Sequence, residues 1–299
     1  MPTTTEISRV LDLLSDYERE HFMKLLSSAA EGERFWESGV ATVYNQYVKT
    51  RSNSDLASAS FDPGAAEGIF APIPVTKSYP GAASIVLPPA APPAANLDAL
   101  LASRRSRRTD GEASMPLSAL STLLQQAAGV TGRTAGYGYE RLPLRSFPSC
   151  GGLQSPEIYL SVQHVTDLAP GIYHYQAQQH ALELVRQGPH GQAMRKLALD
   201  QEHVEKAAAV LVITGVFERL RWKYRERAYR YMCVDVGCLT QNLYLVGEAL
   251  GLSVCAIAGF VDDAVEHLLG IDGEDELALL LVTIGAARDA ANGNGTPQM

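Results

Sequence analysis

The segment Tyr229–Leu250 has the sequence YRYMCVDVGCLTQNLYLVGEAL, and it decides the fold more than any other stretch of the chain. Its apolar side chains recur at alternating spacings of four and three residues, which places them on one face of a helix. Gly251 follows at once, as is typical of a helix C-terminus. A helix this apolar is expected at the centre of the molecule or against a second subunit. The residues of the stripe are Met232, Val236, Leu239, Leu243, Val246 and Leu250.

Short apolar runs on both sides of this helix predict strands. Further helices are expected after Asn96, a suitable N-cap, and from Pro116 to Ala128, which Gly129 ends. The order mixes helices with hairpin-like strands, so we expect an α+β fold rather than strict βαβ alternation. The expected strands are 84–87, 157–162, 171–175, 182–185, 208–214, 252–257 and 277–284.

The residues that precede the long helix are the strongest candidates for acid–base chemistry. Lys223 stands next to Tyr224 within the stretch Trp222–Tyr231, which also holds three Arg and two further Tyr. Neighbouring cations should lower the pKa of both side chains toward neutral pH, where each could act as an acid or a base. The alternative is a solvated basic helix start.

The stretch Arg104-Arg105-Ser106-Arg107-Arg108 carries four guanidinium groups around one hydroxyl. Guanidinium forks match the geometry of a phosphate, and the hydroxyl adds a donor. We therefore expect an anion site. The alternative is a solvated helix end, where the helix dipole favours cations.

Two glycine-containing turns could approach a flat ligand through their backbone. The first is Pro148-Ser149-Cys150-Gly151-Gly152, where Cys150 has no His nearby in sequence and is expected to be a small buried thiol rather than a nucleophile. The second is Ala258-Gly259, at the end of an expected strand, whose N–H groups could bond a cofactor heteroatom. The glycine-rich phosphate motifs of P-loop and Rossmann proteins are absent from the sequence.

Composition narrows the function. The chain has 299 residues, 46% hydrophobic and 19% charged, with a net charge of −8, so general affinity for nucleic acid is not expected. No apolar run approaches the roughly 20 residues that span a bilayer, and the N-terminus lacks the pattern of a signal peptide. The four cysteines show no CxxC spacing, so we expect free thiols in the cytoplasm and no metal site.

We expect two parts in the chain. Residues 1–95 form an extension, helical at first, with apolar residues from Ile7 to Leu26 at helical spacing, then irregular, and ending in the proline-rich linker 88–93. Residues 96–299 form the main domain.

Together these motifs resemble the FMN-binding nitroreductase superfamily. The order Arg-Arg-Ser-x-Arg, Pro-Ser-x-Gly and Gly-Leu-x(5)-Ala-Gly-Phe carries the resemblance, over about residues 75–299. Finer details are similar to the SagB-type dehydrogenase branch, the azoline oxidases of peptide natural-product pathways. Those details are LAPGIYHY at 168–175, KYRERAYRY at 223–231, DVG at 235–237 and QNL at 241–243. Cys150 replaces the usual Ala, and Leu153-Gln154-Ser155-Pro156 replaces the usual Leu-Tyr-Pro.

The resemblance implies a mostly antiparallel sheet flanked by helices, in a homodimer with FMN at the interface. Lys223 and Tyr224 match the catalytic pair of azoline oxidases, and Ala258 and Gly259 match the backbone near flavin N5. Ser149, Cys150 and Gly151 match the loop that reaches the flavin bound mainly by the partner subunit. The FMN phosphate and ribityl contacts match Arg104, Arg105, Ser106, Arg108 and, near the C-terminus, Arg288.

The implied function is FMN-dependent oxidation of a thiazoline or oxazoline to a thiazole or oxazole. The substrate would be a peptide or a carrier-bound chain, and the partners a cyclodehydratase or a peptide synthetase. Two alternatives stay open: an NAD(P)H-dependent reductase of nitro compounds or quinones, and a non-catalytic scaffold subunit of a biosynthetic complex.

Overall fold

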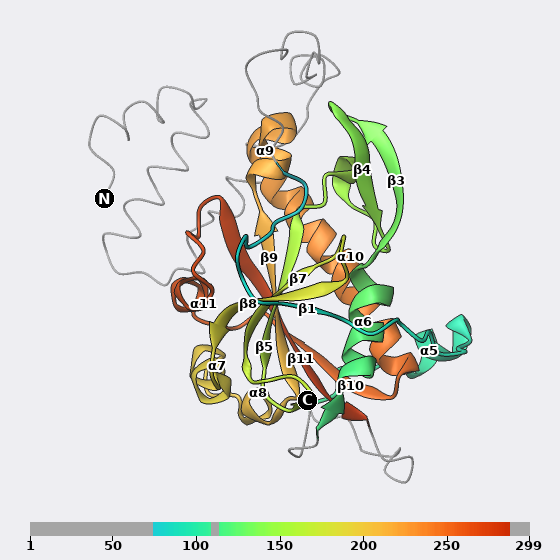
Figure 1. Ribbon diagram of the computed structural model, residues 1–299, viewed down its shortest axis with the longest axis vertical. Coiled ribbons are helices and arrows are strands. Elements are labelled where there is room, and N and C mark those ends of the chain that lie inside the picture. Colours follow the sequence, from blue (N-terminus) through green and yellow to red (C-terminus); the bar gives the residue numbers. More distant parts are fainter. Residues whose placement is uncertain (1–73, 109–113, 288–299) are drawn as a thin grey trace, which may run out of the picture. The chain divides into compact units, whose positions relative to one another are not determined.

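A seven-stranded antiparallel sheet organises the computed structural model, which describes residues 74–108 and 114–287 (Figure 1). The strand order is β1-β8-β7-β5-β9-β11-β10, and every pairing within it is antiparallel. The strands are β1 Ser84–Val86, β5 Pro156–Val162, β7 Gly171–Gln176, β8 Ala181–Gln187, β9 Ala209–Val216, β10 Leu252–Ile257 and β11 Glu276–Ala287. The predicted α+β fold with a mostly antiparallel sheet is confirmed.

Helices cover both faces of the sheet (Figure 1). On one face lie α6 Leu117–Ala128 and α10 Ala228–Ala249; on the other lie α7 Gly191–Leu197, α8 Glu202–Lys206 and α11 Asp262–Leu269. Alternate side chains of a strand point to opposite faces. In β9, Leu211 and Ile213 therefore pack toward α6 and α10, whereas Val210 and Val212 pack toward α7, α8 and α11.

The predicted long helix is α10, which runs next to the sheet with Met232, Leu239 and Leu243 fully buried. The predicted Asn96 cap is also present, since its side chain accepts a hydrogen bond from the Ala99 N–H at the start of α5 Leu97–Ser103.

The stretch from Val130 to Arg145 is rich in glycine and yet is not a loop. It forms a β-hairpin of β3 Val130–Gly136 and β4 Tyr139–Arg145. Three glycines in this stretch resemble a loop in sequence, but Gly138 and its neighbour Tyr137 form the two-residue turn that closes the hairpin. A two-stranded parallel ladder of β2 Met115–Pro116 and β6 Val165–Thr166 completes the sheets of the described part.

Residues 74–93, the described part of the expected extension, contact the main domain. β1 pairs with β8 at the edge of the sheet, and Lys77 and Tyr79 contact side chains of the sheet. The predicted helix from Ile7 to Leu26 lies outside the described residues, so the division into residues 1–95 and 96–299 stays a prediction.

Candidate functional site

One buried carboxylate of α10 holds the Pro-Ser-Cys-Gly turn in place. Asp235 of α10 accepts hydrogen bonds from the Ser149 hydroxyl, the Cys150 N–H and the Ser155 hydroxyl, each at 2.8 Å. These bonds hold the 3-10 turn η2, Cys150–Gly152, against the first half of α10. Within it, Gly151 has φ +64 and is exposed, so its backbone faces outward. The sequence showed Asp235 only as part of the DVG motif. In the structure its role is to hold the Gly151 turn.

Lys223 and Tyr224 end a separate short helix, α9 Glu218–Tyr224. Arg225 has φ +50 and breaks the chain direction, and the 3-10 turn η3, Arg225–Arg227, then leads into α10. The break leaves both side chains half-buried beside the Gly151 turn.

Three polar groups converge above Gly151. A Cβ built on Gly151 would lie 2.6 Å from the Tyr224 hydroxyl, 3.3 Å from the Tyr137 hydroxyl and 3.4 Å from Lys223 Nζ. Lys223 Nζ donates to the Tyr137 hydroxyl at 2.5 Å. The structure therefore brings together Gly151, Lys223 and Tyr224, three residues that the sequence singled out separately, and adds Tyr137 from the hairpin tip, which sequence analysis missed.

The predicted lowering of both pKa values is wrong. Burial alone would lower the pKa of Lys223, but hydrogen bonds to Tyr137 and Tyr224 outweigh it and raise the pKa above its ordinary value. Burial raises the pKa of Tyr224, and the neighbouring Lys223 ammonium offsets this only in part. The arginines nearby in sequence have other partners: Arg221 pairs with Glu218, and Arg227 donates to Tyr231. At neutral pH the pair is therefore an ammonium and a neutral phenol.

Cys150 is not an activated thiol. Burial, followed by the charge of Asp235, raises its pKa to about 12. A thiolate is the reactive form of cysteine, so the raised pKa keeps this side chain inert. All four cysteines, Cys150, Cys233, Cys238 and Cys255, are free.

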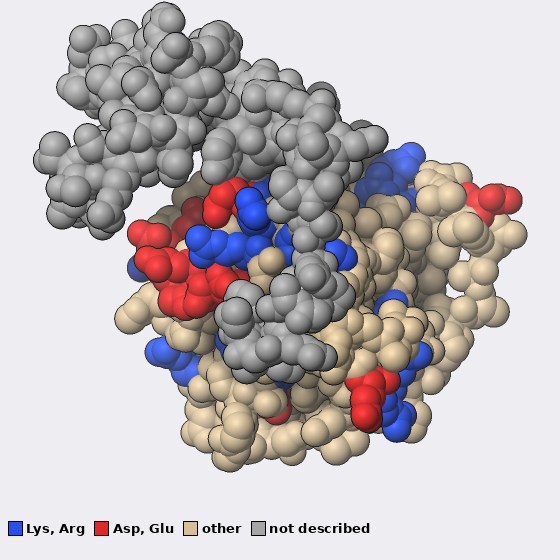
Figure 2. Space-filling view, turned by 90° about the horizontal axis from the view of Figure 1, so that it is seen from above, with Lys and Arg blue, Asp and Glu red and all other residues tan. Residues whose placement is uncertain are grey.

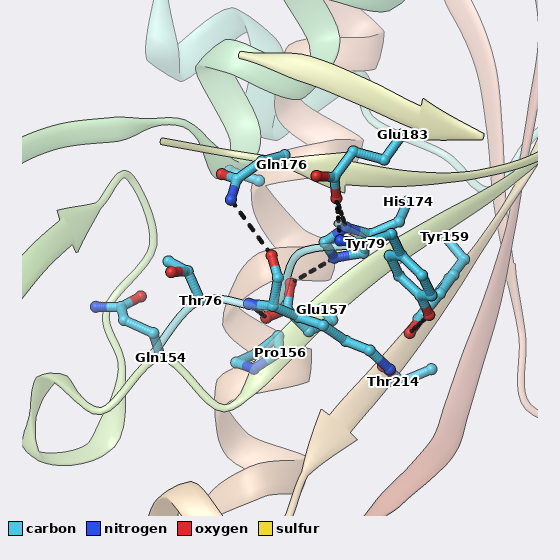
Figure 3. Close-up of polar contacts among 12 residues, drawn as sticks. Thr76, Tyr79, Gln154, Pro156, Glu157, Tyr159, His174, Gln176, Glu183 and Thr214 are labelled. Carbon is cyan, nitrogen blue, oxygen red and sulfur yellow. Dashed lines mark hydrogen bonds and ion pairs between the residues drawn. The ribbon is translucent and has the colours of Figure 1, made fainter. Parts of the chain in front are cut away.

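A buried charge network anchors α9 and the turn to the sheet. Arg219 of α9, 3% exposed, donates to the Gln154 carbonyl at 2.7 Å and to Glu157 at 2.5 Å. Glu157 in turn contacts His174, which lies between Glu157 and Glu183 at 3.0 Å from each (Figure 3). Arg219 thus ties the helix of Lys223 to the chain that leaves the Gly151 turn.

The residues expected to bind a phosphate lie farther along α10. Tyr244 is at their centre: the Tyr244 hydroxyl bonds the Ser106 hydroxyl at 2.9 Å and accepts the Ala256 N–H at 2.9 Å, and Arg104 stacks 5.2 Å from the centre of its ring. The backbone of Arg107 bonds Val254, so the basic stretch lies along the edge strand β10. Sequence analysis did not single out Tyr244, although it directly follows the quoted Gln241-Asn242-Leu243.

The donor set of this stretch suits a phosphate. Ser106 and Arg108 are exposed, as is Arg105, although Arg105 also donates to the Ala102 carbonyl at the end of α5, as a helix-ending cation would. Near this stretch, burial and the charge of Arg108 lower the pKa of His203 in α8. The Nε2 atom of His203 is buried and has no hydrogen-bond partner among the described residues, so it would accept or donate one readily.

Ala258 and Gly259 follow β10 and are exposed, with their backbone open to a ligand. A Cβ on Gly259 would lie 3.3 Å from the Leu199 side chain, which leaves little room for a larger residue. Arg288 lies outside the described residues.

The two groups of residues occupy different positions along α10. Asp235, below the Gly151 turn, and Tyr244, below the basic stretch, are nine residues apart, or about 13 Å along the helix axis. The end that carries α9 shows Lys and Arg side chains gathered beside Asp and Glu side chains (Figure 2). Arg221 of α9 forms ion pairs with Glu218 and Glu226.

Two kinds of feature are absent from residues 74–108 and 114–287. They contain no cluster of three or more His, Cys, Asp or Glu side chains that could hold a metal ion. None of their helices has both the length and the apolarity to cross a membrane.

Comparison with known proteins identifies the family. The model of the nitroreductase family matches residues 101–286, more than half of the chain. The protein "Putative nitroreductase MJ1384" of Methanocaldococcus jannaschii is 31% identical over 189 residues, which cover 63% of this chain and 90% of that protein. The crystal structure of "a putative nitroreductase" from Anabaena variabilis is also similar, with a TM-score of 0.69 and 27% identity. The match covers 87% of this chain and 48% of that one.

A third relative has a more specific name. The microcin B17-processing protein McbC of Escherichia coli is 30% identical over 150 residues, which cover 48% of this chain and 55% of that protein. The fold, the site and these matches define an α+β protein of the oxidoreductase type. The chain belongs to the nitroreductase family.

Proposed function

We propose that this protein is an FMN-dependent dehydrogenase that oxidises a thiazoline or oxazoline ring in a peptide to a thiazole or oxazole. The observation that carries the proposal is the convergence of Lys223, Tyr224 and Tyr137 over the exposed backbone of Gly151. The name of McbC, a microcin B17-processing protein, supports a substrate of the same natural-product kind.

The residues that would hold FMN form two groups. Arg104, Ser106 and Arg108 offer charged and hydroxyl donors to the phosphate, and Ala258 and Gly259 offer backbone to the ring system. Because Ser149, Cys150 and Gly151 lie nearer the start of α10, beside Asp235 rather than Tyr244, we propose that a second copy of the chain supplies this turn and completes the site in a homodimer.

Aromatisation removes one hydride and one proton from the azoline. When bound, FMN supplies the acceptor for the hydride. The proton goes to Tyr224, which must first lose its own proton to solvent. Its phenolate form is stabilised by the Lys223 ammonium, whose hydrogen bond offsets part of the cost of burial. We therefore assign the base to Tyr224 and the charge that supports it to Lys223.

The name of MJ1384 favours a second candidate, a reductase of nitro compounds or quinones that takes its electrons from NAD(P)H. A third possibility, a scaffold subunit, requires no turnover. The polar groups gathered at Gly151 are compatible with each of them, so the choice depends on the reaction.

The test is anaerobic mixing of the purified protein with a thiazoline peptide or with NADPH. The proposal predicts a yellow protein, released FMN rather than FAD, and loss of flavin colour with the peptide, whose product has lost two hydrogens. Bleaching by NADPH alone would favour the reductase, and no bleaching by either would favour the scaffold. Light scattering that gives a 32.2 kDa monomer with full FMN occupancy would contradict the shared site.

A further inference from the structure

The tip of the β3–β4 hairpin carries an unexpected residue. Gly136 pairs with Tyr139, so the turn between them has two residues, Tyr137 with φ +51 and Gly138 with φ +79. A two-residue turn with both φ values positive favours Asn, Asp or Gly, because a Cβ is disfavoured in the left-handed region. An aromatic residue at this position is strained, and such strain is often kept for the sake of the side chain.

The side chain of Tyr137 is directed into the candidate site. Its hydroxyl accepts a hydrogen bond from Lys223 Nζ at 2.5 Å, and Nζ lies 4.4 Å from the centre of its ring. Its ring also meets the edge of Trp222, with centroids 5.6 Å apart. Two neighbouring residues of α9 thus receive the tip of the hairpin.

The hydroxyl of Tyr137 also lies close to Gly151, as does that of Tyr224. The Cβ position of Gly151 is 3.3 Å from the first and 2.6 Å from the second. Lys223 hydrogen-bonds both phenols, so the ammonium stands between two oxygen acceptors. Removing one of them should change both the orientation and the acidity of the ammonium.

We propose that Tyr137 is a positioning residue of the site, which holds the Lys223 ammonium against Tyr224 from the tip of the hairpin. The proposal rests on the proposed function in assigning Lys223 and Tyr224 to the reaction. It explains why a strained turn carries a tyrosine, and it makes the hairpin a wall of the site.

Two substitutions in the full chain with FMN separate this role from a structural one. Tyr137→Phe keeps the ring and the strained backbone but removes the hydroxyl. Tyr137→Asn removes the whole contact and places in the turn a residue that prefers its conformation. The readouts are the rate of flavin bleaching by a thiazoline peptide, the urea unfolding midpoint, and the titration of Lys223, followed by NMR after isotopic labelling of lysine.

We expect Tyr137→Phe to slow bleaching about tenfold or more, because a hydrogen bond to a charged group is lost. The titration of Lys223 should move to lower pH, because an acceptor that favours the ammonium is gone. Tyr137→Asn should slow bleaching at least as much, with an unfolding midpoint equal to or above that of the wild type.

Unchanged bleaching and an unchanged Lys223 titration in Tyr137→Phe would overturn the proposal. So would a loss of stability in Tyr137→Asn that accounts for its loss of rate, since the residue would then be structural. If the wild type does not oxidise the peptide but Tyr137→Phe still shifts the Lys223 titration, the contact stands and the proposed function fails.

Discussion

Gly151→Ala should slow the reaction by moving Tyr224. The new Cβ would lie 2.6 Å from the Tyr224 hydroxyl, whereas ordinary van der Waals contact begins near 3.4 Å, so the hydroxyl must retreat by about 0.8 Å. A misplacement of about 1 Å can cost roughly 100-fold in rate, so we expect single-turnover bleaching to fall about 10- to 100-fold. The Tyr137 hydroxyl and Lys223 Nζ, at 3.3 and 3.4 Å, need hardly move.

The adjacent glycine provides a matched control. Gly152 has φ +70, close to the +64 of Gly151, but the nearest atom to its Cβ position is Leu142 Cδ2, at 3.8 Å. Both alanine variants should lose about 1–2 kcal/mol of stability, because an L-residue is disfavoured in the left-handed region. Only Gly151→Ala should lose most of its rate.

The assay is stopped-flow bleaching of the flavin by a thiazoline peptide without oxygen, together with urea unfolding of both variants. If Gly151→Ala bleaches as fast as Gly152→Ala at equal stability, the position of the Tyr224 hydroxyl does not govern the reaction, and the role given to this side chain is wrong.

Three further predictions concern the scaffold and the cofactor. Arg219→Met should destabilise the fold by about 3–5 kcal/mol in urea unfolding, because it leaves the buried Glu157 carboxylate without its main partner; a smaller effect than for an exposed Arg186→Met control would contradict this. The network also predicts a stability optimum between about pH 4.5 and 6.5 for its own contribution. Arg219 and His174 hold the pKa of Glu157 below 4.5 despite burial, so its stabilisation is lost as pH falls, whereas Glu157 and Glu183 raise the pKa of His174 above 6.5 despite burial, so its stabilisation is lost as pH rises through that raised value. His174→Gln should remove the alkaline part of this dependence, and an unaltered profile would refute the assignment. Arg104→Ala should weaken FMN retention by about 1.5–3 kcal/mol in a dialysis assay, with Arg186→Ala unchanged; equal retention by both variants would place the phosphate elsewhere.

Periodicity predicted most elements of the main domain because burial enforces it. The stripe from Met232 to Leu250 became α10, and the apolar run 208–214 became β9, since both are buried against the sheet. The β3–β4 hairpin was not predicted. Much of it is exposed, so no alternation of apolar and polar residues marks its strands. Its tip residue, Tyr137, could have been suspected only from the flanking Gly136 and Gly138, which favour a turn.

Residue type and motif pointed to Lys223, Tyr224 and Gly151, which the fold brings together, but not to their electrostatics. Proximity in sequence suggested that arginines would lower the pKa of Lys223, yet the break at Arg225 separates α9 from α10. The partners that set the Lys223 pKa are two tyrosines, one of them 86 residues away in the chain. Asp235 and Arg219, which fix the two sides of the site, also act through contacts that only the folded chain creates.

The most direct test of the central claim is single-turnover bleaching by a thiazoline peptide in Lys223→Ala and Tyr224→Phe, with FMN occupancy measured in the same samples. The account predicts that both variants keep FMN and that the loss of the base slows bleaching in Tyr224→Phe by about two to four orders of magnitude. Lys223→Ala should be slowed as well, because the phenolate loses the ammonium that supports it. Bleaching at the wild-type rate in both FMN-loaded variants would contradict the assignment of this pair to the reaction.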